Sequence, residues 1–296
     1  MPSIHPLPSF LYDTKLGEPD RRRLLPRAHK TADCLIPRRP HPETRMDDFE
    51  LLIDLHRNGL RQGPGSDAAT ALALTIAGVD RTAPLAIADL GCGTGASALV
   101  LAELLNAQIT AVDLFDAFLT VLAERAAERG VAEKISTLAC SMDELPFAEA
   151  SLDVIWSEGA IYNIGFENGV KNWRRFLKPG GLLVASEITW LTATRPADLQ
   201  QHWEQEYPQI GPASAKMGQL EQHGYSPCGY FVLPTSCWLE DYYDPMQARF
   251  EGFLQRHSSS EAAQAIVSAE QHEIELYRTH QAHYGYGVYI ARKTAE

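Results

Sequence analysis

Hydrophobic and polar positions alternate in blocks along the middle third of the chain. Short apolar runs that predict buried strands lie near 85–90, 109–113, 135–140, 152–157 and 181–187. Segments with apolar residues at helical spacing separate them, such as 96–105 and 117–129, the latter followed by Gly130. Alternating strands and helices predict a doubly wound, mostly parallel α/β sheet with helices on both faces. Such sheets bind ligands at the carboxyl ends of their strands.

Further periodic segments flank this block. Residues 49–60 predict an amphipathic helix, and residues 67–77 predict a second helix that ends at Gly78. Beyond the fifth strand, 196–224 predicts a helix, and 225–233 and 286–291 predict the last two strands. The intervening residues 234–285 carry helical patterns and several aromatic residues. We interpret them as a helical cap over the substrate pocket, with an extra packing layer as the alternative.

Composition divides the chain into two parts. Residues 1–45 contain nine Lys and Arg against five Asp and Glu, which gives +4, and they are rich in proline. Residues 46–296 contain 17 against 33, which gives −16. The first part has little apolar periodicity, so it predicts a mobile basic arm. We expect residues 46–296 to form the folded domain.

Charge and cysteine content exclude several classes of protein. The net charge of −12 argues against a nucleic-acid partner. The chain has no apolar run near the ~20 residues that span a bilayer, and its first residues lack a secretory pattern. Its five cysteines show neither paired nor metal-binding spacing, which fits a reducing compartment. We therefore expect a cytoplasmic protein without a metal site, and the oligomeric state is left open.

A glycine-rich turn joins the first predicted strand to its helix. Residues 89–95 read DLGCGTG, and the glycines at 91, 93 and 95 allow a ligand to approach the backbone. Asp113 follows Gly91 by 22 residues, where nucleotide-binding units place a ribose-binding carboxylate. Gly91, Gly93 and Ala96 also match the dinucleotide fingerprint, so an NAD-dependent dehydrogenase is an alternative. Asp89 would repel a pyrophosphate, but it would not repel a cofactor that carries an ammonium and a sulfonium.

The motif at 89–95 resembles the first motif of class I S-adenosylmethionine (SAM)-dependent methyltransferases. Residues 140–147, 151–156 and 177–184 resemble later segments of that family, in the same order. The resemblance implies a Rossmann-like seven-stranded sheet whose last strand is antiparallel. It also implies that the glycine loop packs on the methionine part of SAM, that Asp113 holds the ribose and that Met142 and Asp143 border the adenine. The full set of expected cofactor contacts is Asp89, Gly91, Cys92, Gly93, Gly95, Asp113, Leu114, Ser141, Met142, Asp143, Glu158, Gln62 and Gly63.

Three residues are candidates for the chemistry of methyl transfer, which needs an aligned acceptor and, for some acceptors, a base. Glu158 and Tyr162 follow the fourth predicted strand, beside the expected methyl group. They would orient the acceptor or remove its proton. The alternatives are that Glu158 binds the SAM amine and that Tyr162 is a pocket wall. His56 would act as a base if its helix closes over the site, and an ordinary surface histidine is the alternative.

Residues 157–166 and 61–66 together resemble a bacterial subfamily of small-molecule methyltransferases. Some relatives of that kind act on small thiols, so we predict a small thiol as acceptor. A thiol is partly ionised near neutral pH and needs little help from a base. O- or N-methylation of a small carboxylate or amine is the closest alternative, and SAM binding without catalysis is another.

Overall fold

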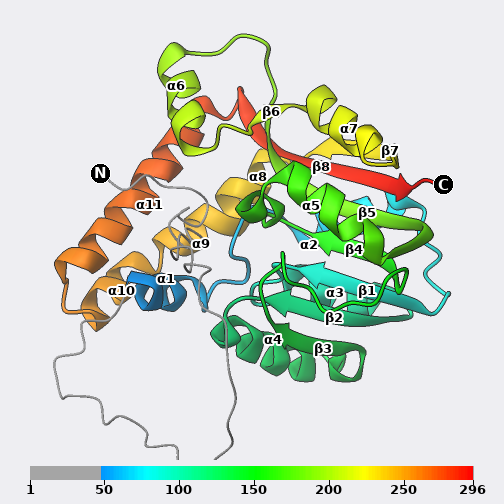
Figure 1. Cartoon of the computed structure of the whole chain (residues 1–296). Helices are drawn as coiled ribbons and strands as arrows, with labels where there is room; N and C mark the ends of the chain where they lie inside the picture. Colours follow the sequence, from blue (N-terminus) through cyan, green and yellow to red (C-terminus); the bar gives the residue numbers. More distant parts are fainter. Residues whose placement is uncertain (1–47, 296) are drawn as a thin grey trace, which may run out of the picture.

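A mixed β-sheet runs through the centre of the computed structural model, which describes residues 48–295 (Figure 1). Its strands are β1 (Leu85–Leu90), β2 (Ala107–Asp113), β3 (Ile135–Ala139), β4 (Leu152–Ser157), β5 (Leu177–Trp190), β6 (Gly211–Pro212), β7 (Tyr225–Val232) and β8 (Tyr284–Lys293). They are ordered β3-β2-β1-β4-β5-β8-β7, and β6 pairs with β5. Strand β8 is antiparallel to β5 and β7, whereas β1 to β6 pair in parallel. The predicted doubly wound sheet is confirmed, and the two-residue β6 is an addition.

Helices cover both faces of this sheet, which explains why its strands lack polar alternation. Along β4, Val154 and Trp156 belong to one buried cluster and Ile155 belongs to the other. The first cluster includes α2 (Asp67–Ala77), α3 (Ala96–Leu104) and α4 (Asp116–Glu128). The second includes α5 (Phe166–Trp173) and α7 (Ala213–Gln222). Successive side chains of one strand therefore pack into two separate hydrophobic cores, one on each face of the sheet.

The predicted helix over 196–224 is wrong in one respect, because two helices occupy this segment. Helix α6 (Ala197–Glu206) ends before Pro208, and α7 begins after Pro212. Proline lacks the backbone N–H that a helix interior requires, so the chain bends there and forms β6. By contrast, α2 has the predicted bounds. The Ser66 hydroxyl caps its start by accepting from the Ala69 N–H (3.1 Å), and Gly78 ends it at φ 63°.

Residues between β7 and β8 form helices on one side of the sheet (Figure 1). These are α8 (Thr235–Trp238), a π-helical turn (Leu239–Tyr243), α9 (Asp244–Gln247), α10 (Phe250–Arg256) and α11 (Glu261–His280). Helix α1 (Asp48–His56) packs against α10 and α11. Asp54 joins them by pairing with Arg256 (2.8 Å) and His257 (2.9 Å). The insert predicted at 234–285 is thus helical, and its role as a cap stays a prediction.

Two further predictions concern the N-terminal arm and membrane-spanning segments. The mobile arm predicted for residues 1–45 lies outside the described residues. Among the helices that are described, none combines the length and apolar character needed to cross a bilayer.

Candidate active site

A pocket that opens to solvent lies where β1, β2, β3 and β4 end. The loops that follow these strands line it, as expected for a doubly wound sheet. A further wall comes from the connection between α1 and α2. The lining segments are 61–64, 91–93, 96–97, 112–115 with Phe118, 140–142, and 158–160 with Asn163.

The glycine loop fits tightly between neighbouring segments. Gly91 has φ +72°, and a Cβ built on it would lie 2.2 Å from the Ala160 Cβ in the loop after β4. The N–H groups of Gly91 and Cys92 both donate to the Val112 carbonyl at the end of β2 (2.8 and 2.9 Å). Packing within the protein therefore already requires a glycine at position 91. Burial beside Asp113 and Asp89 raises the pKa of Cys92 well above its usual value, which fits a small packing residue rather than a nucleophile.

Asp113 occupies the middle of the pocket and retains hydrogen-bonding capacity. Its Oδ2 accepts from the Gly93 N–H (2.8 Å) and its Oδ1 accepts from the Phe115 N–H (3.0 Å). Burial raises the pKa of this carboxyl, and the backbone donors oppose that rise. A carboxylate oxygen can accept more than one hydrogen bond, so Asp113 can also accept two hydroxyl groups from a ligand.

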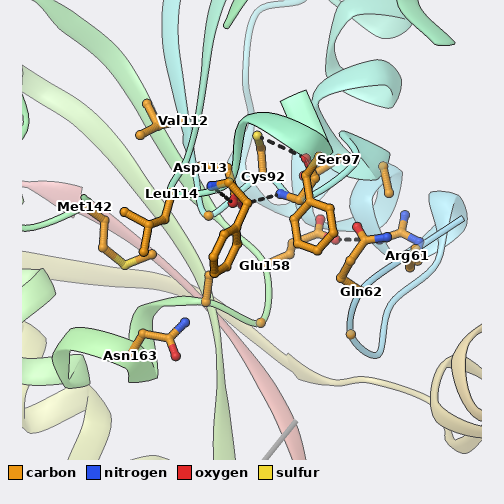
Figure 2. Close-up of a pocket in the computed structure, with 18 of the residues that line it drawn as sticks. Arg61, Gln62, Cys92, Ser97, Val112, Asp113, Leu114, Met142, Glu158 and Asn163 are labelled. Atoms are coloured by element: carbon orange, nitrogen blue, oxygen red, sulfur yellow. Dashed lines mark hydrogen bonds and ion pairs between the residues drawn. The ribbon is translucent and has the colours of Figure 1, made fainter. Parts of the chain in front are cut away.

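The two sides of the pocket differ in character (Figure 2). Val112, Leu114 and Met142 lie on one side of Asp113, and Arg61 and Glu158 lie on the other. An apolar side and a charged side flanking a hydroxyl-binding carboxylate match the three parts of SAM, namely the adenine, the ribose and the amino acid.

Glu158 is held by donors on both carboxylate oxygens. Arg61 Nη1 donates to its Oε2 (2.9 Å), while Thr70 Oγ1 and Trp156 Nε1 donate to its Oε1 (2.7 and 2.9 Å). Arg61 also pairs with Asp67 (3.0 Å). Donors from the protein therefore already occupy both oxygens of this carboxylate and hold it in one orientation. The network favours Glu158 as a fixed charge at the pocket over Glu158 as the catalytic base.

Asp89 is buried next to this charged side with one oxygen unpaired. Ser97, which lines the pocket, donates to Asp89 Oδ2 (2.7 Å), and Oδ1 has no hydrogen-bond partner within residues 48–295. Burial raises the pKa of Asp89 to about 7; the charge of Glu158 adds to this and Arg61 opposes it. An unfilled acceptor on a buried carboxyl is the feature that an ammonium group would satisfy.

The pocket brings together most of the predicted cofactor contacts, and three of them, Asp89, Gly95 and Asp143, lie outside its lining. Gln62 lines the pocket, but its amide is used within the protein. Its Oε1 accepts from the Thr94 N–H (2.8 Å), and its Nε2 donates to the carbonyls of His56 and Gly59 (3.2 Å each). Asp89 and Gly95 support the pocket without lining it, and Asp143 is exposed outside it. The predicted contacts that do line it are Gln62, Gly63, Gly91, Cys92, Gly93, Asp113, Leu114, Ser141, Met142 and Glu158.

The prediction of His56 as a base at the pocket is wrong. His56 has 0% exposure, and its Nε2 lies 3.2 Å from Glu270 Oε1 on α11. It therefore belongs to the interface between α1 and the helical insert. Tyr162, on the 3-10 turn Ile161–Ile164, is also buried and meets the Tyr207 ring edge-on, with centroids 6.3 Å apart. It does not line the pocket, although its neighbour Asn163 does.

Sequence reasoning missed several pocket residues, including Ser97, Phe115, Phe118 and Asn163. Phe115 follows the end of β2 by two residues, and Ser97 is the second residue of α3, which follows the glycine loop directly. The only sequence signal for these residues was their position just after a predicted strand or at the start of a predicted helix, where doubly wound sheets bind ligands.

The chain is similar to known methyltransferases. The profile of a family described as "Methyltransferase domain" matches residues 87–181. An uncharacterized methyltransferase of Bacillus subtilis, YodH, is 31% identical over 115 residues, which cover 39% of this chain and 48% of that protein. A malonyl-(acyl-carrier protein) O-methyltransferase of a Methylovorus species is 31% identical over 36% of this chain and 38% of its own length. The chain thus matches less than half the length of either relative, and other relatives are named as N- and C-methyltransferases.

Solved structures extend the likeness over most of the chain. A SAM-dependent methyltransferase from Geobacter sulfurreducens, in complex with S-adenosyl-L-homocysteine, superimposes with a TM-score of 0.70 at 17% identity. The superposition covers 82% of this chain and 96% of that one. Residues 87–181 therefore form a methyltransferase domain, and the chain has the Rossmann-like fold of class I SAM-dependent methyltransferases.

Proposed function

We propose that this protein transfers a methyl group from SAM to a small molecule. The observation that carries the proposal is Asp113, which retains acceptor capacity between an apolar and a charged side of one pocket. Met142 and Leu114 would contact the adenine, and Asp113 would bind the ribose hydroxyls. Arg61, Glu158 and the unpaired oxygen of Asp89 would surround the amino-acid part.

When bound, SAM supplies a methyl group that is already activated by a sulfonium. The protein has to align an acceptor and exclude water from it. Gly159 and Asn163, which follow β4, line the pocket where an acceptor would enter. We test the proposal by incubating the protein with SAM and a panel of amines, thiols, carboxylates and phenols. Formation of S-adenosylhomocysteine with at least one acceptor is expected, and SAM binding without any turnover would favour a binding protein.

The acceptor predicted from the sequence, a small thiol, reacts as a thiolate. The surroundings of Tyr162 give this choice little support. Lys216, a buried cation of this region, is paired with Glu187 at 3.4 Å. Further buried carboxyl groups lie in this neighbourhood, and an ionised carboxylate would repel an anion. The structure therefore favours the N-methylation alternative.

Asp113→Ala is expected to weaken SAM binding about 30-fold, because charge-assisted hydrogen bonds to the ribose contribute roughly 2 kcal/mol. Isothermal titration calorimetry with SAM would measure the change. Asp116→Ala is the matched control, since Asp116 is exposed three residues further along the chain. Equal affinity of the folded Asp113→Ala variant and wild type would rule out the ribose assignment.

SAM affinity is expected to rise about tenfold between pH 6 and pH 7.5. At the lower pH a carboxyl with a raised pKa holds a proton, and binding of a cation beside it has to displace that proton. The responsible group is Asp89, whose pKa of about 7 lies above its ordinary value. Below pH 7 the carboxyl must lose its proton before it can pair with the SAM ammonium. The charge of Glu158 favours the protonated form of Asp89, and the charge of Arg61 favours its ionised form.

The pH dependence is measured by calorimetry on wild type and on Asp89→Asn, so that titration of SAM itself cancels. We expect the variant to lose the rise in affinity and to retain the hydrogen bond from Ser97. The same slope in both proteins would show that Asp89 does not face the ammonium.

A further inference from the structure

Buried tyrosines and glutamates gather behind the pocket, on four separate elements. The tyrosine–glutamate cluster consists of Tyr162, Tyr242, Tyr286, Glu270 and Glu273, all at most 9% exposed. Tyr242 lies in the π-helical turn, Tyr286 lies on β8, and both glutamates lie on α11. Burial raises the pKa of Tyr242, and the nearby charges of Glu270 and Glu273 raise it further, with Tyr162 and Tyr286 also close.

This cluster lies directly behind the pocket wall. Gly159 lines the pocket, and a Cβ built on it would lie 3.3 Å from the Tyr286 ring and 3.8 Å from the Tyr286 hydroxyl. Gly159 follows Glu158 in the chain, and Glu158 pairs with Arg61 on the charged side of the pocket. The cluster therefore meets the pocket at Gly159.

Four polar atoms of the cluster have no hydrogen-bond partner in the described part of the chain. They are the hydroxyls of Tyr242 and Tyr286 and the Oε2 atoms of Glu270 and Glu273. The other glutamate oxygens are used, since Glu270 Oε1 lies 3.2 Å from His56 Nε2 and Glu273 Oε1 accepts from the Tyr243 hydroxyl (2.7 Å). Buried polar groups are normally paired, so unpaired groups gathered in one place indicate a ligand with hydrogen-bonding groups, and the two glutamate oxygens call for donors on it.

The two carboxyl groups of the cluster favour a cation, because a cation bound beside a carboxyl with a raised pKa displaces its proton and pairs with the carboxylate. Glu270 and Glu273 are three residues apart on one helix, and burial together with the charge of Glu270 raises the pKa of Glu273 well above its usual range. His56 faces Glu270, and Arg249 lies near it but donates to the carbonyls of Leu55 and Pro245. No group of three or more His, Cys, Asp or Glu within residues 48–295 has a metal-binding arrangement, which favours an organic cation.

Aromatic rings add to the preference for a cation. The Trp238 ring lies 4.8 Å from the Tyr286 ring and stacks on Tyr277 at 4.2 Å, centroid to centroid. The faces of such rings attract ammonium groups through their electron-rich π systems. A thiolate in the same place would meet carboxylates instead of cations.

We infer that the methyl acceptor is a small amine, which binds as an ammonium among the tyrosines and glutamates behind Gly159. This inference rests on the proposed methyltransferase function. The ammonium gives one proton to a carboxylate of the cluster. The nitrogen lone pair then bonds to the methyl carbon as the carbon–sulfur bond breaks, and that electron pair stays on sulfur. The carboxylic acid later releases its proton to solvent, so charge and atoms balance.

Tetramethylammonium tests the cation site without turnover, because it has no N–H and cannot accept a methyl group. We expect saturable binding to the full chain by calorimetry, above a sodium chloride control of equal ionic strength. The double variant Glu270→Gln, Glu273→Gln is expected to weaken this binding at least about tenfold, since both carboxyl groups that can pair with the cation are lost. Glu275→Gln, an exposed glutamate on the same helix, is the matched control and should bind as wild type does.

Turnover then separates the acceptor classes. With SAM, 2-phenylethylamine is expected to yield S-adenosylhomocysteine at least about tenfold faster than 2-phenylethanethiol, which matches it in shape. SAM affinity and melting temperature of the double variant are measured alongside to exclude misfolding. Absence of tetramethylammonium binding in wild type, or turnover of the thiol but not the amine, would overturn the inference. Failure of SAM to bind would instead overturn the proposed function, and the tetramethylammonium result would still decide the cation site.

Discussion

Gly91→Ala is expected to abolish SAM binding and to lower the free energy of unfolding by about 3 kcal/mol, since backbone strain and overpacking add. The new Cβ would lie 2.2 Å from the Ala160 Cβ, and it would require φ +72° from an alanine. Ala160 is anchored by its own backbone and cannot swing aside as a long side chain can. The loops after β1 and β4 must therefore separate, and the pocket between them deforms.

A second glycine isolates the effect of the clash. Gly130 has φ +69°, and nothing lies within 4 Å of a Cβ built there. Gly130→Ala thus carries the same backbone strain without the collision, and it should retain SAM binding. Urea denaturation and calorimetry on both variants make the comparison. If the two variants behave alike, the contact between Gly91 and Ala160 has no part in shaping the pocket.

Lys216→Met is expected to lower the free energy of unfolding at pH 8 by about 3–5 kcal/mol, the usual cost of leaving a buried charge unpaired. Lys216 and Glu187 are 1% and 0% exposed, and their charged atoms lie 3.4 Å apart. Lys216 also lies over the Phe166 ring at 4.8 Å, a contact that the methionine side chain can largely retain. The loss therefore comes from Glu187, whose carboxylate remains in the interior without its partner.

The pH dependence of this loss identifies its cause. Burial already raises the pKa of Glu187, and Lys216 opposes that rise, so removal of the lysine raises the pKa further. A folded-state pKa above the unfolded value means that stability falls as the pH rises through that interval. Lys216→Met should therefore be much closer to wild type at pH 5 than at pH 8, and adding Glu187→Gln should restore much of the stability at pH 8. Urea denaturation that gives the same loss at both pH values would point to packing instead of charge.

The strands and the glycine loop could be predicted because their signals are local. Ile87 to Leu90 form a continuous apolar and acidic run, and Gly91 follows it directly. Asp113 was found by its spacing from Gly91, and it contacts the Gly93 N–H of the same loop. The family resemblance added the antiparallel last strand, which no local pattern distinguishes from a parallel one.

Residues whose partners lie far along the chain could not be placed in this way. His56 pairs with Glu270, 214 residues away, so its helical position gave no sign that it faces the insert. Gln62 spans 32 residues to accept from Thr94, which uses the amide expected to meet the cofactor. Glu270 and Glu273 are charged residues on a helix and would ordinarily face solvent. Their burial follows from the packing of α11, which the sequence pattern does not specify.

The helical insert leaves and rejoins the sheet at almost the same point. Val232 at the end of β7 pairs with Gly287 on β8, and the Leu233 N–H donates to the Tyr286 carbonyl. The segment between them can therefore lengthen, shorten or be exchanged while the two strands keep their pairing. Asp113 and Gly91 lie on β2 and after β1, beyond the reach of such an exchange. In evolution and in engineering, this segment can diverge while the strands that carry Asp113 and lead to Gly91 keep their pairing, but the connection between α1 and α2 has to diverge with it, because the Gly65 N–H donates to the Cys237 carbonyl.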